Sequence, residues 1–203
     1  MNLDDYRAFT RQLIENLQTY PEVLGFSAMG SMAEINRLPD AWSDHDFFVL
    51  TRDGHAESFR QNIDWLPDHE NIVLNIRETQ HGLKILYRSG HLLEFAVFDD
   101  NEFVDISVND YAVLLDRSDI GTRLAQLQQW TNETAQAAEP EKDVVMFLAL
   151  LLVGAGRCMR GEVLSGHLFI KSHALSHLLK AIPVYLPVEA QGRLDNLDSA
   201  RRF

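Results

Sequence analysis

The chain has 203 residues, enough for one domain or two small ones, and 46% of them are hydrophobic, as in ordinary globular proteins. Its 30 acidic residues outnumber its 18 lysines and arginines, which gives a formal net charge of −12. This excludes a broad nucleic-acid-binding surface and favours a cationic partner, and the single cysteine, Cys158, excludes a disulfide or a cysteine-based zinc site within one chain.

Two stretches bear on where the protein works. The first residues, "MNLDDYRAFTRQ", are acidic and helix-like, whereas a secretory signal is basic and then apolar. The longest apolar run, residues 144–156, is too short to cross a bilayer and is typical of a buried helix. We therefore expect a cytoplasmic protein that does not enter a membrane.

The first third of the chain alternates helical and strand patterns. Apolar residues at helical spacing predict an amphipathic helix that opens the chain. A strand that ends in a Gly-Ser turn, a second strand, a helix and a third strand are predicted to follow it. In order, these five segments cover residues 3–18, 22–30, 46–51, 55–66 and 71–78.

The next segment is predicted to form a β-hairpin. Ser89-Gly90 is a two-residue turn signal between two strand-like runs, over residues 82–99. Residues 105–117 are expected to add edge strands, and residues 119–130 are predicted to be helical.

The character of the chain changes after residue 130. A polar stretch, 131–142, is predicted as a linker, and two long helices separated at Gly161 follow it, the second ending at Pro183. The last ten residues, "LDNLDSARRF", read as a helix start with Asp198 or Ser199 as N-cap, so we expect a helical region that is incomplete at its C-terminus. The predicted fold is α+β: a mixed-sheet domain over 1–130 and a helical domain over 143–203.

The stretch that carries chemistry is "MGSMAEINRLPDAWSDHDFFVL", in which two aspartates precede an apolar strand. Residues i and i+2 of a strand share a face, so Asp44 and Asp46 would project to one side and His45 to the other. Two close carboxylates repel each other unless a cation lies between them. Oxygen ligands suit a hard divalent cation such as Mg²⁺, which also binds substrate phosphates.

The Gly-Ser turn is the complementary half of such a site. A strand that ends at Gly30 and Ser31 and leads into a short helix would point main-chain N–H groups outward, toward a phosphate. Arg37 lies in the loop that follows and would add positive charge. Together with the cations at the aspartates, this turn would hold a nucleoside triphosphate.

A third acid would complete a site for two metal ions. Glu94 is the main candidate, because it lies inside an apolar strand where a glutamate without a partner is costly. A metal ion or an incoming hydroxyl would serve as that partner. Asp99, Asp100 and Asp105 are rival third acids.

Gly-Ser, a loop, Asp-x-Asp on a strand and a lone acid on a later strand resemble the DNA polymerase β-type nucleotidyltransferase superfamily, over residues 23–98. The resemblance implies that Gly30 and Ser31 hold the nucleotide phosphates and that Asp44 and Asp46 bind both Mg²⁺ ions. Glu94 would bind one ion or act as general base. Members often carry a small residue shortly after Gly-Ser, where this chain has Glu34.

The helical second part resembles the C-terminal domain of antibiotic nucleotidyltransferases, which modify aminoglycosides or lincosamides. The implied function is Mg²⁺-dependent transfer of a nucleoside monophosphate, with AMP from ATP expected, to a hydroxyl of a small cationic acceptor. A homodimer is possible by the same resemblance. The alternatives are an antitoxin-type enzyme that modifies a partner protein and a catalytically inactive binding module.

Several other residues have two possible roles each. Lys171 reaches a phosphate or is simply solvated, and Trp42 stacks on a base or sugar or packs in the core. Three residues at the helix junction cap the helices or contact a substrate: Arg157, Arg160 and Glu162. His173 and His177 are four residues apart, but Ala174 stands where the zinc-protease pattern needs glutamate, so a structural role is favoured.

Overall fold

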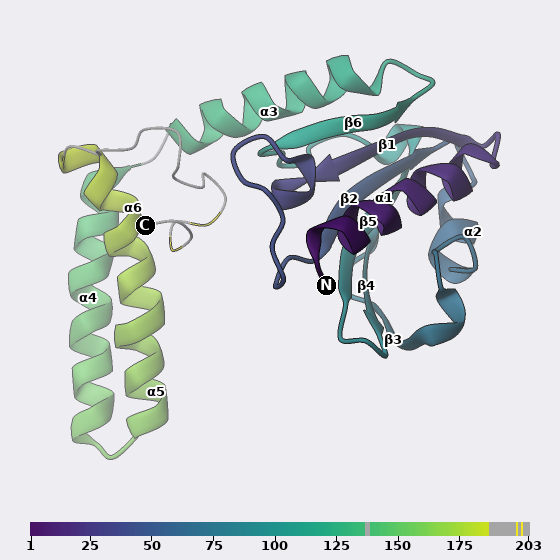
Figure 1. Ribbon diagram of the computed structural model, residues 1–203. Helices are drawn as coiled ribbons and strands as arrows, with labels where there is room; N and C mark the ends of the chain where they lie inside the picture. Colours follow the sequence, from purple (N-terminus) through teal and green to yellow (C-terminus); the bar gives the residue numbers. More distant parts are fainter. Residues whose placement is uncertain (137–138, 187–197, 199, 201–203) are drawn as a thin grey trace. The chain divides into compact units, whose positions relative to one another are not determined.

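The computed structural model describes residues 1–136, 139–186, 198 and 200 (Figure 1). The chain divides into two compact units, Met1–Trp130 and Thr131–Phe203. The first is built on a mixed β-sheet with flanking helices, and the described part of the second is helical. This is the α+β architecture that the sequence predicts.

The sheet of the first unit has six strands in the order β3-β4-β5-β2-β1-β6. The central strands β2 and β5 run parallel, and every other neighbouring pair is antiparallel. The strands are β1 (Val23–Met29), β2 (His45–Thr51), β3 (Ile72–Arg77), β4 (Gly82–Tyr87), β5 (Leu92–Asp99) and β6 (Tyr111–Asp116). The expected strand over 105–117 is therefore β6, and it lies at one edge of the sheet.

Three helices accompany the sheet. The opening helix α1 (Leu3–Gln18) begins at Asn2, whose side chain accepts a hydrogen bond from the Asp5 N–H at 2.8 Å. The second, α2 (Ala56–Gln61), is shorter than the predicted helix over 55–66, because the chain becomes extended at Asn62. The third, α3 (Ile120–Gln136), continues past the predicted end at residue 130.

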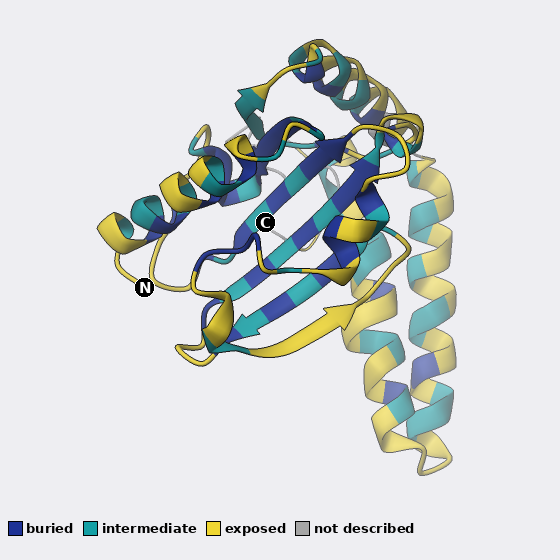
Figure 2. Ribbon diagram, turned by 90° about the vertical axis from the view of Figure 1, so that its right-hand side faces the viewer, coloured by how far each residue is buried: buried dark blue, intermediate teal, exposed yellow. Residues whose placement is uncertain are grey.

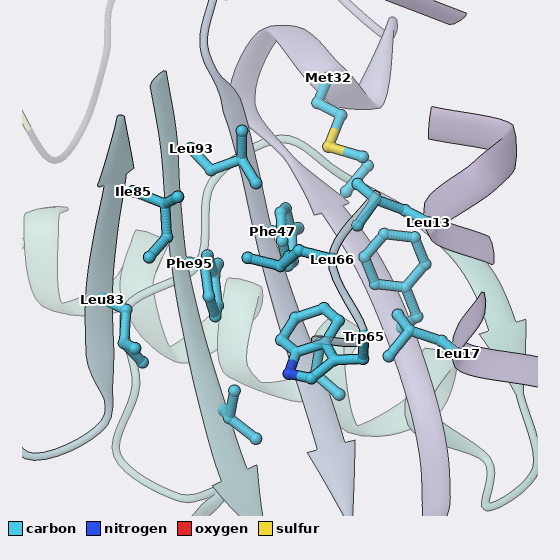
Figure 3. Packing of buried hydrophobic residues seen from close by; sticks show 14 of the residues in the cluster. Leu13, Leu17, Met32, Phe47, Trp65, Leu66, Leu83, Ile85, Leu93 and Phe95 are labelled. Atoms are coloured by element: carbon cyan, nitrogen blue, oxygen red, sulfur yellow. The ribbon is translucent and has the colours of Figure 1, made fainter. Parts of the chain in front are cut away.

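Hydrophobic residues fill both faces of the sheet. On one face, side chains from α1 and the segment after α2 pack against β2, β4 and β5, as Figure 3 shows for Leu13, Trp65, Leu66, Phe47 and Phe95. On the other face, the start of α3 covers a second cluster that contains Met29, Leu50, Phe98, Phe103, Val108, Ile120 and Leu124. The central strands are accordingly the most buried, whereas the edge strand β3 is largely exposed (Figure 2).

The hairpin between β4 and β5 differs from its prediction by one residue. The main-chain N–H of Tyr87 donates to the carbonyl of His91, so three residues, 88–90, form the connection. Gly90 takes the left-handed conformation, with φ +86°, that ends such a three-residue loop. The expected two-residue turn at Ser89-Gly90 is therefore wrong, because Arg88 also belongs to the loop.

The second unit contains a hairpin of long helices. Its first arm is α4 (Pro140–Met159), and its second arm runs through α5 (Val163–Leu168), a π-helical segment η4 (Phe169–Ala174) and α6 (Leu175–Tyr185). Gly161, at φ +83°, turns the chain between the arms, as the sequence predicts.

Two boundaries in this region differ from expectation. Residues 131–136 continue α3 and Pro140 opens α4, so much of the predicted linker 131–142 is helical. Pro183 lies inside α6 and does not end it. Among the described residues, no helix has both the length and the apolar character that crossing a bilayer requires. Apart from Asp198 and Ala200, the predicted helix start at 194–203 lies outside the described residues.

Candidate functional site

The two aspartates of the motif lie on one face of the chain at the start of β2. Burial alternates from Ser43 to Phe47, with Asp44 and Asp46 half-buried and the residues between and beside them buried. The pKa of the Tyr6 phenol is raised, first by burial and then by the negative charges of Asp44 and Asp46. Both carboxylates therefore raise the pKa of the same phenol.

A row of polar side chains, made up of Tyr6, Thr10, His45 and His91, supports the start of β2 on the face opposite the aspartates. The Tyr6 hydroxyl donates to the main-chain carbonyl of Asp44 at 2.6 Å, and the Tyr6 ring stacks on His45 at 3.7 Å between centroids. The His45 ring contacts Thr10 Oγ1 at 3.0 Å through Nε2 and His91 Nε2 at 2.8 Å through Nδ1. Because these contacts fix His45, they also fix the backbone on either side of it, which carries Asp44 and Asp46.

The two histidines of this row are uncharged near neutral pH. Burial lowers the pKa of His45 to about 3, with a further contribution from His91. Burial also lowers the pKa of His91 to about 4. The row is therefore a structural support and adds no positive charge beneath the aspartates.

Asp46 and Glu94 are direct neighbours across the central parallel strands. They are register partners in the pairing of β2 with β5, so their side chains leave the same face of the sheet. Adjacent strands are about 4.8 Å apart, which brings the two carboxyl groups within reach of one ion or one substrate. The register thus places Glu94, the expected third acid, beside Asp46, and its role in a metal site stays a prediction.

Gly30 directly follows β1, the other neighbour of β2, and lies against Asp46. A Cβ added at Gly30 would be 3.7 Å from Asp46 Oδ2, and the residue has φ +53°. Its N–H donates to the Asp110 carbonyl at 2.9 Å, so the expectation that this N–H points outward toward a phosphate is wrong. Ser31, in the short 3₁₀ turn η1 (Gly30–Ala33), is only 5% exposed.

Glu94 has a partner that the sequence analysis did not identify. Lys84, its register partner on β4, places Nζ 3.1 Å from Glu94 Oε1 and 3.0 Å from Glu78 Oε1. Hydrogen bonds to these two carboxylates, that to Glu78 first, raise the pKa of Lys84. Lys84 is therefore the partner of Glu94 in this structure, and binding of a metal ion or a hydroxyl by Glu94 stays a prediction.

The donor set fits a hard cation only in part. Asp44 and Asp46 offer carboxylate oxygens on one face, which suit Mg²⁺. Within the part of the chain that the structure describes, no group of three or more His, Cys, Asp or Glu side chains is arranged to hold a metal ion. Glu94 would join such a set only on leaving Lys84.

The rival third acids have other surroundings. Asp99 Oδ1 accepts hydrogen bonds from the N–H groups of His55 and Ala56, at 3.1 and 2.7 Å, and so caps α2. Asp100 pairs with Arg123. Asp105 is exposed, at φ 54°. Asp99 is also the partner of Thr51 at the far end of β5, about 16 Å along the strand from Glu94.

The loop between the Gly-Ser turn and the aspartates is held at both ends. Glu34 adopts φ 52°, a conformation that suits glycine, and the Arg7 guanidinium fixes its carboxylate with contacts of 3.0 and 2.5 Å. Arg37 Nη2 donates to Ser43 Oγ at 3.3 Å, and its charge partly opposes the rise in the Tyr6 pKa that burial and the acidic neighbours cause. Arg37 thus lies in the same electrostatic environment as the aspartates.

Trp42 does not pack in the core. The residue is 94% exposed. Its main-chain N–H donates a hydrogen bond to Asp40 Oδ1 at 2.9 Å. A large aromatic ring is therefore presented to solvent two residues before Asp44. Of its two readings, core packing is excluded by this exposure.

The remaining candidates belong to the second unit. Lys171 is exposed on η4, and its phosphate role stays a prediction. At the junction, Arg157 lies over the Phe169 ring at 4.2 Å, and Arg160 Nε contacts Glu162 Oε1 at 3.0 Å. His177 Nδ1 lies 2.6 Å from Asp143 Oδ1, which is a helix-to-helix contact.

Comparison with known proteins adds little to this geometry. No protein-family model and no curated protein matches the sequence. Among solved structures, a STING-associated CdnE c-di-GMP synthase from Capnocytophaga granulosa matches with a TM-score of 0.35 and 14% identity. The match covers 97% of this chain and 56% of that one, so the chain spans about half of that protein's length. Similarity at this level carries no argument about function.

Proposed function

We propose that the first unit is a Mg²⁺-dependent nucleotidyltransferase that moves a nucleoside monophosphate, with AMP from ATP expected, to an acceptor hydroxyl. One observation carries the proposal: Asp46 and Glu94 are register partners on parallel strands, with Gly30 against the Asp46 carboxylate. Carboxylates from two neighbouring strands can bind a divalent cation, and the glycine beside them leaves room for the triphosphate that this cation accompanies.

Asp44 and Asp46 would hold the cation, and Glu94 would join them once Lys84 releases it. A bound Mg²⁺ would neutralise phosphate charge and orient the triphosphate. Arg37 would add positive charge on the loop side. Ser31 and Gly30 would lie beneath the phosphates.

The transfer joins two substrates, the nucleotide and the acceptor, while the carboxylates would hold Mg²⁺ beside them. The acceptor hydroxyl oxygen forms a bond to the α-phosphorus of the nucleotide, and the bond from that phosphorus to pyrophosphate breaks. Pyrophosphate leaves with the bonding electron pair, and the hydroxyl proton passes to Glu94 Oε2 or to water. The formal net charge of −12 favours a cationic acceptor, for which aminoglycosides and lincosamides are the proposed classes.

The test is transfer from labelled ATP in the presence of Mg²⁺ to a panel of aminoglycosides and lincosamides, with the product mass determined. An added mass equal to AMP is expected, and Asp46→Asn should reduce transfer by at least about a hundredfold. Asp105→Asn is the matched control, because Asp105 is exposed and asparagine tolerates its positive φ. Equal transfer by both variants would overturn the proposal. Label on a polypeptide would identify a protein acceptor.

A second function is favoured by the ion pair between Lys84 and Glu94. A lysine that neutralises the third acid is compatible with a domain that binds a nucleotide without transferring it. Calorimetry with Mg²⁺ and a non-hydrolysable ATP analogue, beside the transfer assay, separates the two. Binding without transfer to any acceptor supports the binding module.

A further inference from the structure

The sheet carries four apolar side chains that lie outside both hydrophobic clusters. Leu86 on β4 pairs with Leu92 on β5 and with Leu74 on β3, so these three form one row on one face of the sheet. Ile76 is two residues from Leu74 and shares that face. Leu74 and Ile76 are 40% and 48% exposed, and Leu86 and Leu92 are half-buried. We call these four residues the β3–β5 surface.

The four residues are not part of the core of the first unit. Neither buried cluster includes them, and they are absent from the partly buried hydrophobic residues that pack against the clusters in the described part of the chain. The strand β3, which carries two of them, is exposed along most of its length (Figure 2). Apolar side chains gathered on one exposed face indicate a binding surface.

The β3–β5 surface adjoins the candidate site. Ile76 is the register partner of Lys84, Lys84 pairs with Glu94, and Glu94 pairs with Asp46. This second row therefore crosses β3, β4, β5 and β2 on the same face as the apolar row. Neighbouring strands are about 4.8 Å apart, so β3 lies about 10 Å from β5. A small molecule on the β3–β5 surface would thus extend to Glu94 and Asp46.

The charges beside the surface already bind an ammonium group. Lys84 Nζ lies 3.0 Å from Glu78 Oε1 and 3.1 Å from Glu94 Oε1, so two carboxylates share one positive charge. The group of three keeps one negative charge in excess. Glu78 directly follows β3 and its side chain is 52% exposed, so a ligand can reach it from solvent. A second ammonium group is the complement of this excess charge.

The apolar surface and the adjoining charge together describe one kind of ligand. A neutral apolar molecule would cover the β3–β5 surface but would leave the carboxylates with their excess charge. A polycation without a hydrocarbon portion would pair with the carboxylates but would leave Leu74 and Ile76 exposed to water. A molecule with both an ammonium group and a hydrocarbon portion satisfies both features.

We propose that the β3–β5 surface binds an amphipathic amine, a small molecule with an ammonium group, a hydrocarbon portion and a hydroxyl. The hydrocarbon portion lies on Leu74 and Ile76, the ammonium group pairs with Glu78 and Glu94, and the hydroxyl extends toward Asp46. That this amine is the acceptor of the transfer rests on the proposed function. Of the two proposed acceptor classes, lincosamides have such a hydrocarbon portion, whereas aminoglycosides are polar polycations.

The first test measures binding without nucleotide and without Mg²⁺. Lincomycin is titrated into the full chain with ¹³C-labelled isoleucine and leucine methyl groups, and NMR spectra are recorded. The methyl signals of Ile76 and Leu74 should shift with saturation, and single substitutions at these positions assign them. Ile14, which packs on the opposite face of the sheet, is the internal control and should not shift. Kanamycin at the same ionic strength should shift the Ile76 and Leu74 signals much less.

Two variants separate the contributions of the hydrocarbon contact and the charge, with affinity measured by calorimetry. Ile76→Ser should weaken lincomycin binding about threefold to tenfold. Val104→Ser is its control, because Val104 is an apolar residue of similar exposure, 56%, beyond the far end of β5. Glu78→Gln should weaken binding by a similar factor, and Glu70→Gln, at the other end of β3, should not.

The outcomes that contradict the proposal are distinct from loss of the fold. All four substituted side chains are exposed, so circular dichroism of each variant should match that of the wild type. Equal affinity in Ile76→Ser and Val104→Ser would overturn the proposal, as would equal shifts with kanamycin. Signals of Ile76 and Leu74 that do not move at all would overturn it too, and would indicate that a second copy or another part of the chain covers the surface.

The transfer assay shows separately whether the enzymatic function holds. Lincomycin that binds on the β3–β5 surface but receives no AMP, in an assay in which no other acceptor receives it, would refute the transferase and leave an amine-binding surface. Transfer to lincomycin that is unchanged in Ile76→Ser and in Glu78→Gln would refute the β3–β5 surface and leave the transferase intact.

Discussion

Lys84 and Glu94 face each other across the antiparallel strands β4 and β5, with Nζ 3.1 Å from Oε1. The pair lies beside Asp46, the register partner of Glu94 on the other side. If Glu94 is to bind a metal ion, that ion must compete with a lysine for the same carboxylate. Replacing Lys84 therefore tests directly whether Glu94 is a metal ligand.

Replacing Lys84 should strengthen metal binding. Lys84→Met removes the competing cation and leaves Glu94 to join Asp46, so we expect Mg²⁺ affinity to rise about threefold to tenfold. The effect is kept small by solvent, because both side chains are about one-third exposed. Titration calorimetry with Mg²⁺ measures it, and Lys84→Arg, which keeps the charge, is the control. Unchanged or weaker binding in Lys84→Met would show that Glu94 is not a ligand.

Alanine substitutions at Gly30 and Gly54 distinguish the effect of backbone strain on stability from an effect on ligand binding at the candidate site. Both have positive φ, +53° and +80°, so alanine at either position should lower the unfolding free energy by about 1 kcal/mol. Only the methyl group at Gly30 would touch Asp46, since a Cβ at Gly54 meets nothing within 4 Å. Gly30→Ala should therefore lower metal and nucleotide affinity, whereas Gly54→Ala should not. Equal affinities in the two variants would exclude Gly30 from the site.

The exposed ring of Trp42 offers a direct signal for nucleotide binding. The chain has three tryptophans, of which Trp65 is buried and Trp130 is partly exposed. If Trp42 stacks on a base, ATP should quench tryptophan fluorescence, and Trp42→Leu should abolish the change. Trp130→Phe is the control and should retain it. Quenching that survives in Trp42→Leu would assign Trp42 no part in binding.

Much of the fold follows from local patterns in the sequence. The opening helix, the six strands and the change to helices near residue 130 all follow from spacing of apolar residues and from turn signals. Period-two alternation also placed Asp44 and Asp46 on one face, and the burial pattern of the strand agrees with it. Their role in catalysis remains a prediction.

What could not be predicted depends on register. A two-residue turn at Ser89-Gly90 would have set Lys84 opposite Phe95, on the other face of the sheet from Glu94. The actual loop contains one more residue, so Lys84 pairs with Glu94. The contact of His45 with His91 likewise requires the parallel pairing of β2 with β5, which joins segments distant in the chain.

The two buried histidines should make the fold sensitive to acid. Their folded pKa values, about 3 for His45 and about 4 for His91, lie below the ordinary 6.5. Below pH 6.5 the unfolded chain therefore binds more protons, and the unfolding free energy falls as the pH falls toward 4. At pH 5 the loss is about 2 kcal/mol for each histidine.

Urea unfolding at pH 7.5 and pH 5.0 measures this loss. His91→Asn, which keeps a polar side chain beside His45, should reduce the difference between the two pH values by about half. His69→Asn is the control, because it replaces an exposed histidine that lies outside the buried pair. A wild-type stability that is the same at both pH values would show that the histidines are not buried uncharged.

Two glycines in α4 should respond to the same substitution in opposite directions. A Cβ at Gly154 would lie 2.6 Å from Ile170 Cγ1 and 3.0 Å from the Gly166 carbonyl, so Gly154→Ala must push the arms of the hairpin apart. We expect a loss of about 1–3 kcal/mol in the stability of the second unit. At Gly156 the nearest atom is the flexible Arg160 Nη1 at 3.5 Å, so Gly156→Ala should gain up to about 1 kcal/mol from helix propensity. Thermal unfolding followed by circular dichroism, with hydrogen exchange of α4 amides, measures both. A Gly154→Ala variant as stable as Gly156→Ala would contradict the close packing of the two arms, because only that packing distinguishes the two positions.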